Sequence, residues 1–176
     1  MDDLNKILSS SVKKGFILGI AFILFTTITY ISDIHLFSIS TGIAAFIIVF
    51  GGEIVYSIIS AKRYRNELGG KITYLQVATY IFSLMLVASI INAIFNYALY
   101  NLIDPDYLNM QVEYFAEDMA DFISGDQLEE TLAKMDEKVV EMKEIGGMLL
   151  QSGTVSIVMS LILALFIKKD INDINE

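Results

Sequence analysis

The sequence predicts an all-α integral membrane protein with four transmembrane helices and an acidic, extracytoplasmic helical hairpin between helices three and four. Hydrophobic residues make up 55% of the 176 residues, and charged residues only 19%. Average soluble domains contain about 45–50% apolar and about 25% charged residues. The apolar residues also cluster in four runs, each close to the length that a helix needs to cross a bilayer core of about 30 Å. These runs lack the polar stripe that a surface helix of a soluble domain carries.

The four runs define the expected spans. Residues 15–31 and 72–103 contain no charged residue, and residues 36–61 contain one, Glu53. The last span, residues 148–167, belongs to a segment 146–176 that also supplies a C-terminal tail. No small-x-small cleavage site follows the first run, so we expect that run to remain as an anchor. Cysteine is absent, which excludes disulfides and thiolate metal sites.

Basic residues indicate the orientation of the spans. They flank the start of the first span, the connection from the second to the third and the end of the fourth: Lys6, Lys13, Lys14, Lys62, Arg63, Arg65, Lys71, Lys168 and Lys169. The short connection 32–36 has no lysine or arginine. Because lysine and arginine are retained on the cytoplasmic side, both termini are expected to be cytoplasmic.

The long connection, residues 104–145, carries the acidity of the protein. It holds 13 acidic residues against three lysines, a net charge of −10, whereas the whole chain carries −9. Binding to nucleic acid needs a basic face, so a nucleic-acid partner is not expected. The connection starts with Asp104-Pro105, and a residue before proline is disfavoured in a helix.

Two helical patterns predict that this connection is an ordered hairpin. Apolar residues recur at intervals of 4, 3, 4 and 3 in two series: Leu108, Val112, Phe115, Met119 and Phe122, then Leu128, Leu132, Met135, Val139 and Met142. Such seams pair helices, and each arm is expected to span about 18 residues, or roughly 27 Å. Asp126 with Glu129 resembles a helix N-cap for the second arm. The alternative is a pair of helices that lie flat on the membrane, although such helices usually carry basic polar faces.

Glu53 is the one charged residue in the predicted spans. A charge at the bilayer centre costs a few kcal/mol, and such residues commonly have a function. Counting about six residues, roughly 9 Å, from the inner end of the second span near Ile59 makes Glu53 level with Tyr80. We therefore predict an intramembrane polar site of Glu53, Gln76, Tyr80 and Ser83. The carboxyl group either locks two helices by hydrogen bonding or binds a proton or cation.

Other polar and small residues form an outer cluster and two packing seams. Ser89, Asn92, Asn96 and Tyr100 lie on the opposite face of the third span, toward its outer end. They either bond to neighbouring helices or line an outward-facing polar cavity. The small-residue seams, which let helices approach closely, serve internal packing or a homodimer; they consist of Gly15 and Gly19 in the first span and Ser152, Ser156, Ser160 and Ala164 in the fourth.

The stretch YRNELGGKITYLQVATYIFSLMLVASIINAIFNY, followed by LIDPDYL, resembles the bacterial domain of unknown function family 4199. The similarity extends over most of the chain. It includes the basic turn with Gly69-Gly70, the aromatic-rich third span, the Asp-Pro break, the acidic Met-rich insert and a last span that ends in Lys-Lys. The resemblance implies a four-span protein of the bacterial cytoplasmic (inner) membrane, and implies no reaction or ligand.

These observations favour a non-enzymatic membrane protein. The chain shows no nucleophile–base pair, phosphate-binding loop or histidine cluster, so neither catalysis nor a cofactor or metal is expected. The interpretation that we favour from the sequence is a structural or accessory component of the envelope that contacts another envelope protein through residues 106–145. The alternative is a small dimeric proton- or cation-coupled transporter that uses Glu53.

Overall fold

The computed structural model describes residues 2–120 and 122–168, and within these ranges it is helical apart from short connections. Four of its helices are long and apolar enough to cross a membrane, which confirms the four predicted spans. Asp121 and residues 169–176, the expected cytoplasmic tail, lie outside the described residues. In chain order the elements are α1 (Asp2–Ile31), α2 (Ile39–Glu67), α3 (Tyr74–Ala98), the π-helical turn η1 (Leu99–Ile103), α4 (Tyr107–Met119), α5 (Gly125–Lys143) and α6 (Ile145–Ile167).

Two of the long helices extend beyond the uncharged runs. Helix α1 begins at Asp2 rather than at residue 15, and α2 continues to Glu67 rather than ending at residue 61. Charged side chains do not end a helix, because the backbone hydrogen bonds continue past them. Lysine and arginine can also extend their charged ends toward water. The 30 residues of α1 measure about 45 Å, so the helix is longer than a bilayer core of about 30 Å.

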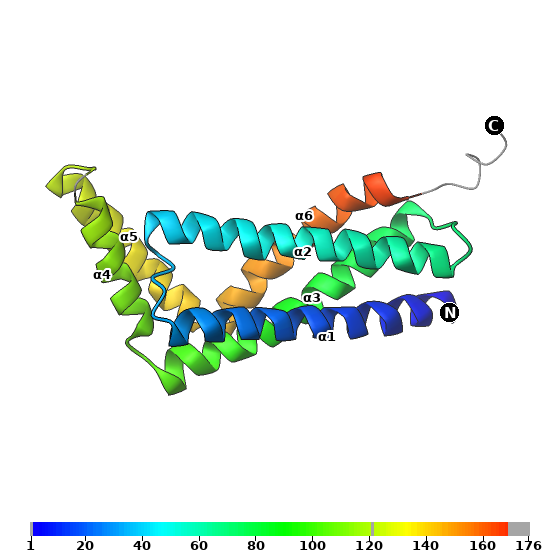
Figure 1. Cartoon of the computed structure of the whole chain (residues 1–176), viewed down its shortest axis with the longest axis horizontal. Helices are drawn as coiled ribbons and strands as arrows, with labels where there is room; N and C mark the ends of the chain where they lie inside the picture. Colours follow the sequence, from blue (N-terminus) through cyan, green and yellow to red (C-terminus); the bar gives the residue numbers. More distant parts are fainter. Residues whose placement is uncertain (1, 121, 169–176) are drawn as a thin grey trace.

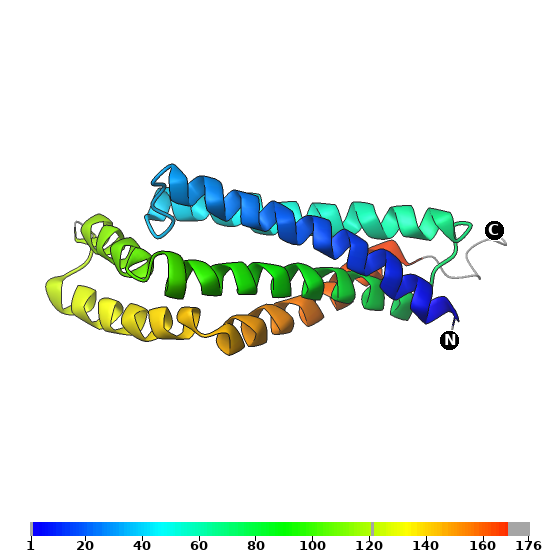
Figure 2. The same cartoon turned by 90° about the horizontal axis from the view of Figure 1, so that it is seen from below.

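Helix α3 is the centre of the bundle. Figure 1 shows the long helices side by side, with the start of α1 and the α2–α3 turn at one end and α4 and α5 at the other. In the view of Figure 2, α3 lies between α1 and α6, and its contacts with these two helices are the most extensive in the chain. Helix α2 contacts the other three long helices much less.

The two small-residue seams are both used for packing inside the chain. A Cβ atom added at Gly19 would lie 2.9 Å from the Cβ of Ile91, and one at Gly15 would lie 2.9 Å from the Cβ of Val87. These glycines therefore allow α1 to approach α3. On α6, which packs mainly on α3, Ser156, Ser160 and Ala164 are buried.

The connection from α2 to α3 depends on two glycines and a helix cap. Gly69 and Gly70 have φ angles of 76° and 87°, a region that glycine adopts without steric cost. Thr73 then caps α3 in a reciprocal arrangement with Gln76, in which the Thr73 N–H donates to Gln76 Oε1 at 3.0 Å. The cap satisfies backbone donors that the first turn of a helix leaves free.

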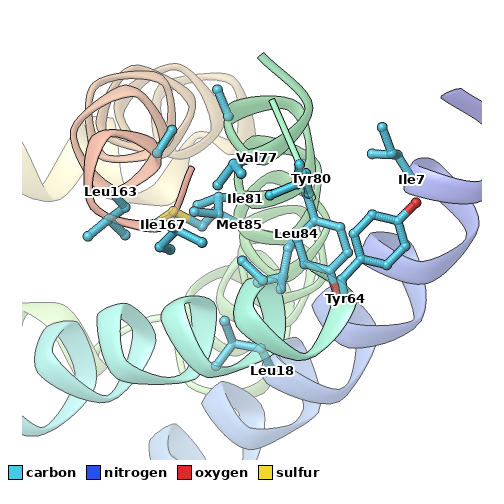
Figure 3. Close-up of a cluster of buried hydrophobic side chains, with 14 of the residues drawn as sticks. Ile7, Leu18, Tyr64, Val77, Tyr80, Ile81, Leu84, Met85, Leu163 and Ile167 are labelled. Carbon is cyan, nitrogen blue, oxygen red and sulfur yellow. The ribbon is translucent and has the colours of Figure 1, made fainter. Parts of the chain in front are cut away.

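A buried apolar core fills the half of the bundle near the basic end. Figure 3 shows α3 side chains, among them Ile81 and Met85, against Ile167 of α6, and all three are at most 1% exposed. On another side of α3, the Tyr80 ring stacks on Tyr64 of α2 with centroids 4.8 Å apart. This core holds the half of α2 near the basic end against α3.

A second, smaller core joins α4 and α5 to the opposite end of the bundle. Leu99, Tyr107 and Leu108 are buried there together with Val139 of α5. Helix α4 also contacts the first turn of α2. The Asp118 carboxylate accepts hydrogen bonds from the Ser38 hydroxyl and from the N–H of Ile39. A carboxylate at a helix N-terminus is favourable for both the free N–H groups and the helix dipole.

The bounds of α4 and α5 differ in two respects from the sequence pattern. Helix α4 has 13 residues and ends at Met119, so Phe122 lies outside it and is 75% exposed. Helix α5 is capped by Ser124 and Gln127 rather than by Asp126 and Glu129. The reason for the second difference is the S-x-x-Q spacing, in which the Ser124 N–H donates to Gln127 Oε1 at 3.4 Å.

Candidate functional site

The depth of Glu53 follows from the length of α2. Glu53 is the middle residue of this 29-residue helix, which runs from Ile39 to Glu67. It therefore lies 14 residues, or about 21 Å, from the basic end. The same distance along α3 from Tyr74 leads to Ala88, because the two helices are antiparallel (Figure 1). The carboxyl group is consequently level with the outer polar cluster of α3.

Glu53 lines a cavity of about 330 Å³ that is bounded by all four long helices and the end of α5. All four residues of the predicted outer cluster, Ser89, Asn92, Asn96 and Tyr100, line the same cavity. The fourth span contributes Gln151, Ser152, Val155 and Ser156. The remaining lining side chains are apolar: Phe22, Val49, Ala93, Met142 and Met148. The cavity lies between the two buried cores.

The structure does not bring Glu53 together with the other three residues of the predicted intramembrane site. Gln76 is used in the cap of α3. Tyr80 is buried against Tyr64, and its hydroxyl lies 3.5 Å from the Ser10 hydroxyl. Ser83 is buried outside the cavity. The predicted grouping was wrong because it took Ile59 as the inner end of the span, whereas α2 continues for two more helical turns.

Two serine hydroxyls of the cavity wall already donate to their own helix. Ser152 donates to the Met148 carbonyl and Ser156 to the Ser152 carbonyl, both at 2.8 Å. Each serine oxygen can therefore still accept a hydrogen bond but has no hydrogen left to donate.

The two asparagines of the wall have unused acceptors. Asn92 and Asn96 stand one turn apart on α3, and the Oδ1 atom of each is buried without a hydrogen-bond partner. An unsatisfied buried polar group costs about 1–3 kcal/mol. Two amide oxygens of the cavity-lining asparagines are therefore acceptors that the protein itself does not satisfy.

Glu53 has no charged partner in the cavity. Within residues 2–120 and 122–168, no lysine, arginine or histidine lines the cavity, and the Glu53 carboxyl group makes no ion pair or hydrogen bond. These described residues also contain no cluster of three or more histidine, cysteine, aspartate or glutamate side chains that could hold a metal ion. The cavity thus combines a single carboxyl group with neutral polar and apolar side chains.

The chain matches a known family over most of its length. The family model described as Protein of unknown function (DUF4199) covers residues 13–169. The chain belongs to the DUF4199 family. No curated protein and no solved structure matches it. The match begins within α1, covers the other three long helices of this DUF4199 member, and includes every residue that lines the cavity.

Sequence reasoning did not identify several residues that line the cavity of this DUF4199 member. Gln151 is the strongest omission, because it is the one amide side chain in the uncharged run 148–167. Met148, Gln151, Ser152 and Val155 share a face of α6 at helical spacing, which could have indicated a common environment. Met142 at the end of α5 had no such signal, because its contribution depends on how α5 meets α6.

Proposed function

We propose that this protein is a small proton- or cation-coupled membrane transporter in which Glu53 is the coupling group. One observation carries the proposal: the mid-membrane carboxyl group lines a cavity together with polar side chains of two other long helices. Ionisable residues within membrane segments commonly face such cavities and mark substrate or proton pathways. A carboxyl group that either holds a proton or pairs with a cation can exchange one for the other.

The basic ends of the helices support a direction for this site. Lysine and arginine next to membrane spans are retained on the cytoplasmic side, so both termini are cytoplasmic in our proposal. The cavity runs from Glu53 along α3 to Tyr100, toward the end that carries α4 and α5. A solute would therefore enter from the extracytoplasmic side of the bacterial inner membrane.

All four long helices of one chain contribute to the lining of this cavity, and our proposal therefore uses a single chain for the binding site. The seams that could have formed a dimer interface are already used inside the chain at Gly15, Gly19, Ser156, Ser160 and Ala164. A homodimer would have to use another surface, and the outward face of α2 is available. Ile43, Phe46 and Ile47 are each about 60% exposed there.

Transport is tested in proteoliposomes that contain a pH-sensitive dye. Na⁺, K⁺ or phenethylammonium is added outside, and the internal pH is recorded for the wild type and for Glu53→Gln. We expect a cation-dependent pH change that the variant loses. Glu67→Gln is the matched control, because Glu67 stands on the same helix but is exposed and outside the cavity. Equal pH changes in Glu53→Gln and wild type would refute the proposal.

A second function is supported by the charge of α4 and α5. We propose that these helices form an acidic, exported hairpin through which the protein acts as an accessory component of the envelope. In the described part of the segment, the two ion pairs between side chains are Glu130–Lys134 and Lys138–Glu141, both within α5 and exposed. Most of the acidic side chains therefore remain available for a basic protein partner of residues 106–145.

The accessory role is tested by cross-linking in cells, followed by purification in mild detergent. We expect a stoichiometric partner that is lost when Glu113 and Glu117 on α4 are both replaced by glutamine. Glu67→Gln serves again as the control. Purification of the wild type with no partner would contradict this role and would leave the transport proposal unaffected.

A further inference from the structure

The composition of the cavity wall also indicates which class of ligand it accepts. We propose that the ligand is an organic ammonium ion that carries N–H donors and an apolar body, and that its nitrogen binds between Glu53, Asn92 and Asn96. This inference rests on the proposed function, because it concerns the same cavity. It adds that the ligand is an amine rather than a metal ion, an anion or a quaternary ammonium ion.

The size and donor set of the cavity do not suit a divalent metal ion. Its volume of about 330 Å³ falls within the range of about 300–1,000 Å³ that is typical of small-molecule sites. Ca²⁺ binds six to eight oxygen atoms at short distances, several of them from carboxylates. The cavity offers one carboxyl group, and the described residues contain no cluster of acidic side chains or histidines suited to a metal.

The charge of the cavity selects against anions. Glu53 is the acidic side chain of the lining, and the described lining residues contain no cationic group that could offset it. A positively charged ligand would replace the missing counter-charge. Hydrogen bonds from a cationic N–H group to a carboxylate are also about twice as strong as those between neutral groups.

The hydrogen-bonding state of the wall distinguishes a primary amine from a quaternary one. The Oδ1 atoms of Asn92 and Asn96 have no partner, and the Ser152 and Ser156 hydroxyls already donate within α6. The two asparagine oxygens and the two serine hydroxyls are therefore acceptors that an N–H donor can satisfy, beside the amide N–H groups that Asn92, Asn96 and Gln151 also bring to the wall. A primary ammonium ion has three N–H donors, whereas a trimethylammonium group has none.

The apolar part of the lining accommodates the body of the amine. Phe22 of α1 and Val155 of α6 line the cavity, and Met142 and Met148 border it where α5 meets α6. Methionine side chains are flexible and adapt to irregular apolar shapes. An aromatic or branched aliphatic body can therefore pack on these side chains while the ammonium group reaches Glu53.

The test is isothermal titration of the full-length protein in detergent micelles with three probes. Phenethylammonium carries the charge and the N–H donors, its N,N,N-trimethyl derivative keeps the charge but lacks the donors, and 2-phenylethanol lacks the charge. We expect phenethylammonium to bind at least about tenfold more tightly than either of the other two, since a hydrogen bond to a charged group accounts for this factor. Titration into protein-free micelles corrects for partition of the probes.

Two variants locate the binding site. Glu53→Gln should weaken phenethylammonium binding at least about tenfold. Asn92→Leu should weaken the binding of phenethylammonium but leave that of the trimethyl derivative unchanged. Glu67→Gln and Asn66→Leu are the matched controls, because both lie at the exposed end of α2 outside the cavity. The three-probe comparison on the wild type needs no variant and remains decisive if a variant does not fold.

The outcomes separate this inference from the transport proposal. Absent binding of phenethylammonium, equal binding of the primary and trimethyl ions, or unchanged binding by Glu53→Gln would each overturn the inference. If Glu53-dependent pH changes with Na⁺ or K⁺ persist in that case, transport stands and only the ligand class is wrong. Tight, Glu53-dependent amine binding without any pH change would support the ligand class and refute coupled transport.

Discussion

Replacement of Gly15 by alanine should separate α1 from α3. The new Cβ atom would lie 2.9 Å from the Cβ of Val87, about 0.5 Å closer than an ordinary van der Waals contact, and would also meet the backbone oxygen of Leu84. A backbone oxygen of α3 cannot rotate away as a flexible side chain can. The helices must therefore move apart along the most extensive packing surface of the chain.

The magnitude of this effect is obtained by comparison with Gly52→Ala. Both substitutions exchange glycine for alanine within a long helix, which favours the helix by about 1 kcal/mol. A Cβ atom at Gly52 meets no other atom within 4 Å, so its stability should not fall. The difference between the two variants isolates the clash, for which overpacking costs of about 1–3 kcal/mol are typical.

The assay is thermal unfolding in detergent micelles, followed by circular dichroism. A change of 1 kcal/mol corresponds to about 2–4 °C for a chain of this size, so Gly15→Ala should unfold at least about 2 °C below Gly52→Ala. Gly19→Ala should behave like Gly15→Ala, because its new Cβ atom would meet Ile91. If Gly15→Ala is as stable as Gly52→Ala, the close approach of α1 and α3 is wrong.

Three further substitutions test the end of the bundle that carries α4 and α5 and the cap of α3. The Tyr107 hydroxyl is buried without a hydrogen-bond partner, so Tyr107→Phe should raise the free energy of unfolding by about 1 kcal/mol. Burial, reinforced by nearby carboxylates, also raises the pKa of Tyr107. The neutral hydroxyl therefore contributes stability that is present below pH 10 and is lost at higher pH. Because the variant lacks this group, its melting temperatures at pH 8 and pH 11 should differ less than those of the wild type. Asp118→Asn weakens the cap of α2 and should speed amide hydrogen exchange at Ile39 by several-fold. Asp136→Asn, on the exposed face of α5, is the control and should not change this exchange. Equal exchange at Ile39 in both variants would contradict the role of Asp118. Thr73→Ala removes the cap of α3 and should cost about 1 kcal/mol in thermal unfolding, and an unchanged melting temperature would refute that cap.

The four spans and the family could be predicted from the sequence because both depend on local patterns. A segment that crosses lipid must be apolar over about 20 residues and must satisfy its backbone hydrogen bonds internally, which leaves a strong local signal. The turn after α2 was equally visible in Gly69 and Gly70, whose φ angles are positive. The orientation of the spans and the export of residues 104–145 stay predictions.

The candidate site shows where local patterns stop being sufficient. Asn92 and Asn96 were identified with Ser89 and Tyr100 because all four stand on one face of one helix, and the structure keeps them together. Glu53 of α2, which lines the cavity with them, was instead grouped with Tyr80, because a charge pattern does not reveal where a helix ends. An error of two turns at the end of α2 moved the expected partner of Glu53 by about 12 Å along α3.

The amino-acid sequence by itself determined that four helices are long and apolar enough to cross a membrane, that one of them carries a carboxyl group, and that the negative charge of the chain is concentrated between the third and fourth of these helices. Only the tertiary structure decided that Glu53 shares a cavity with Asn92, Asn96 and the polar face of α6. The physical reason is that the apolar character of a segment is a local property. Which faces meet depends on helix ends and on the close approach of α1 and α6 to α3 through small residues.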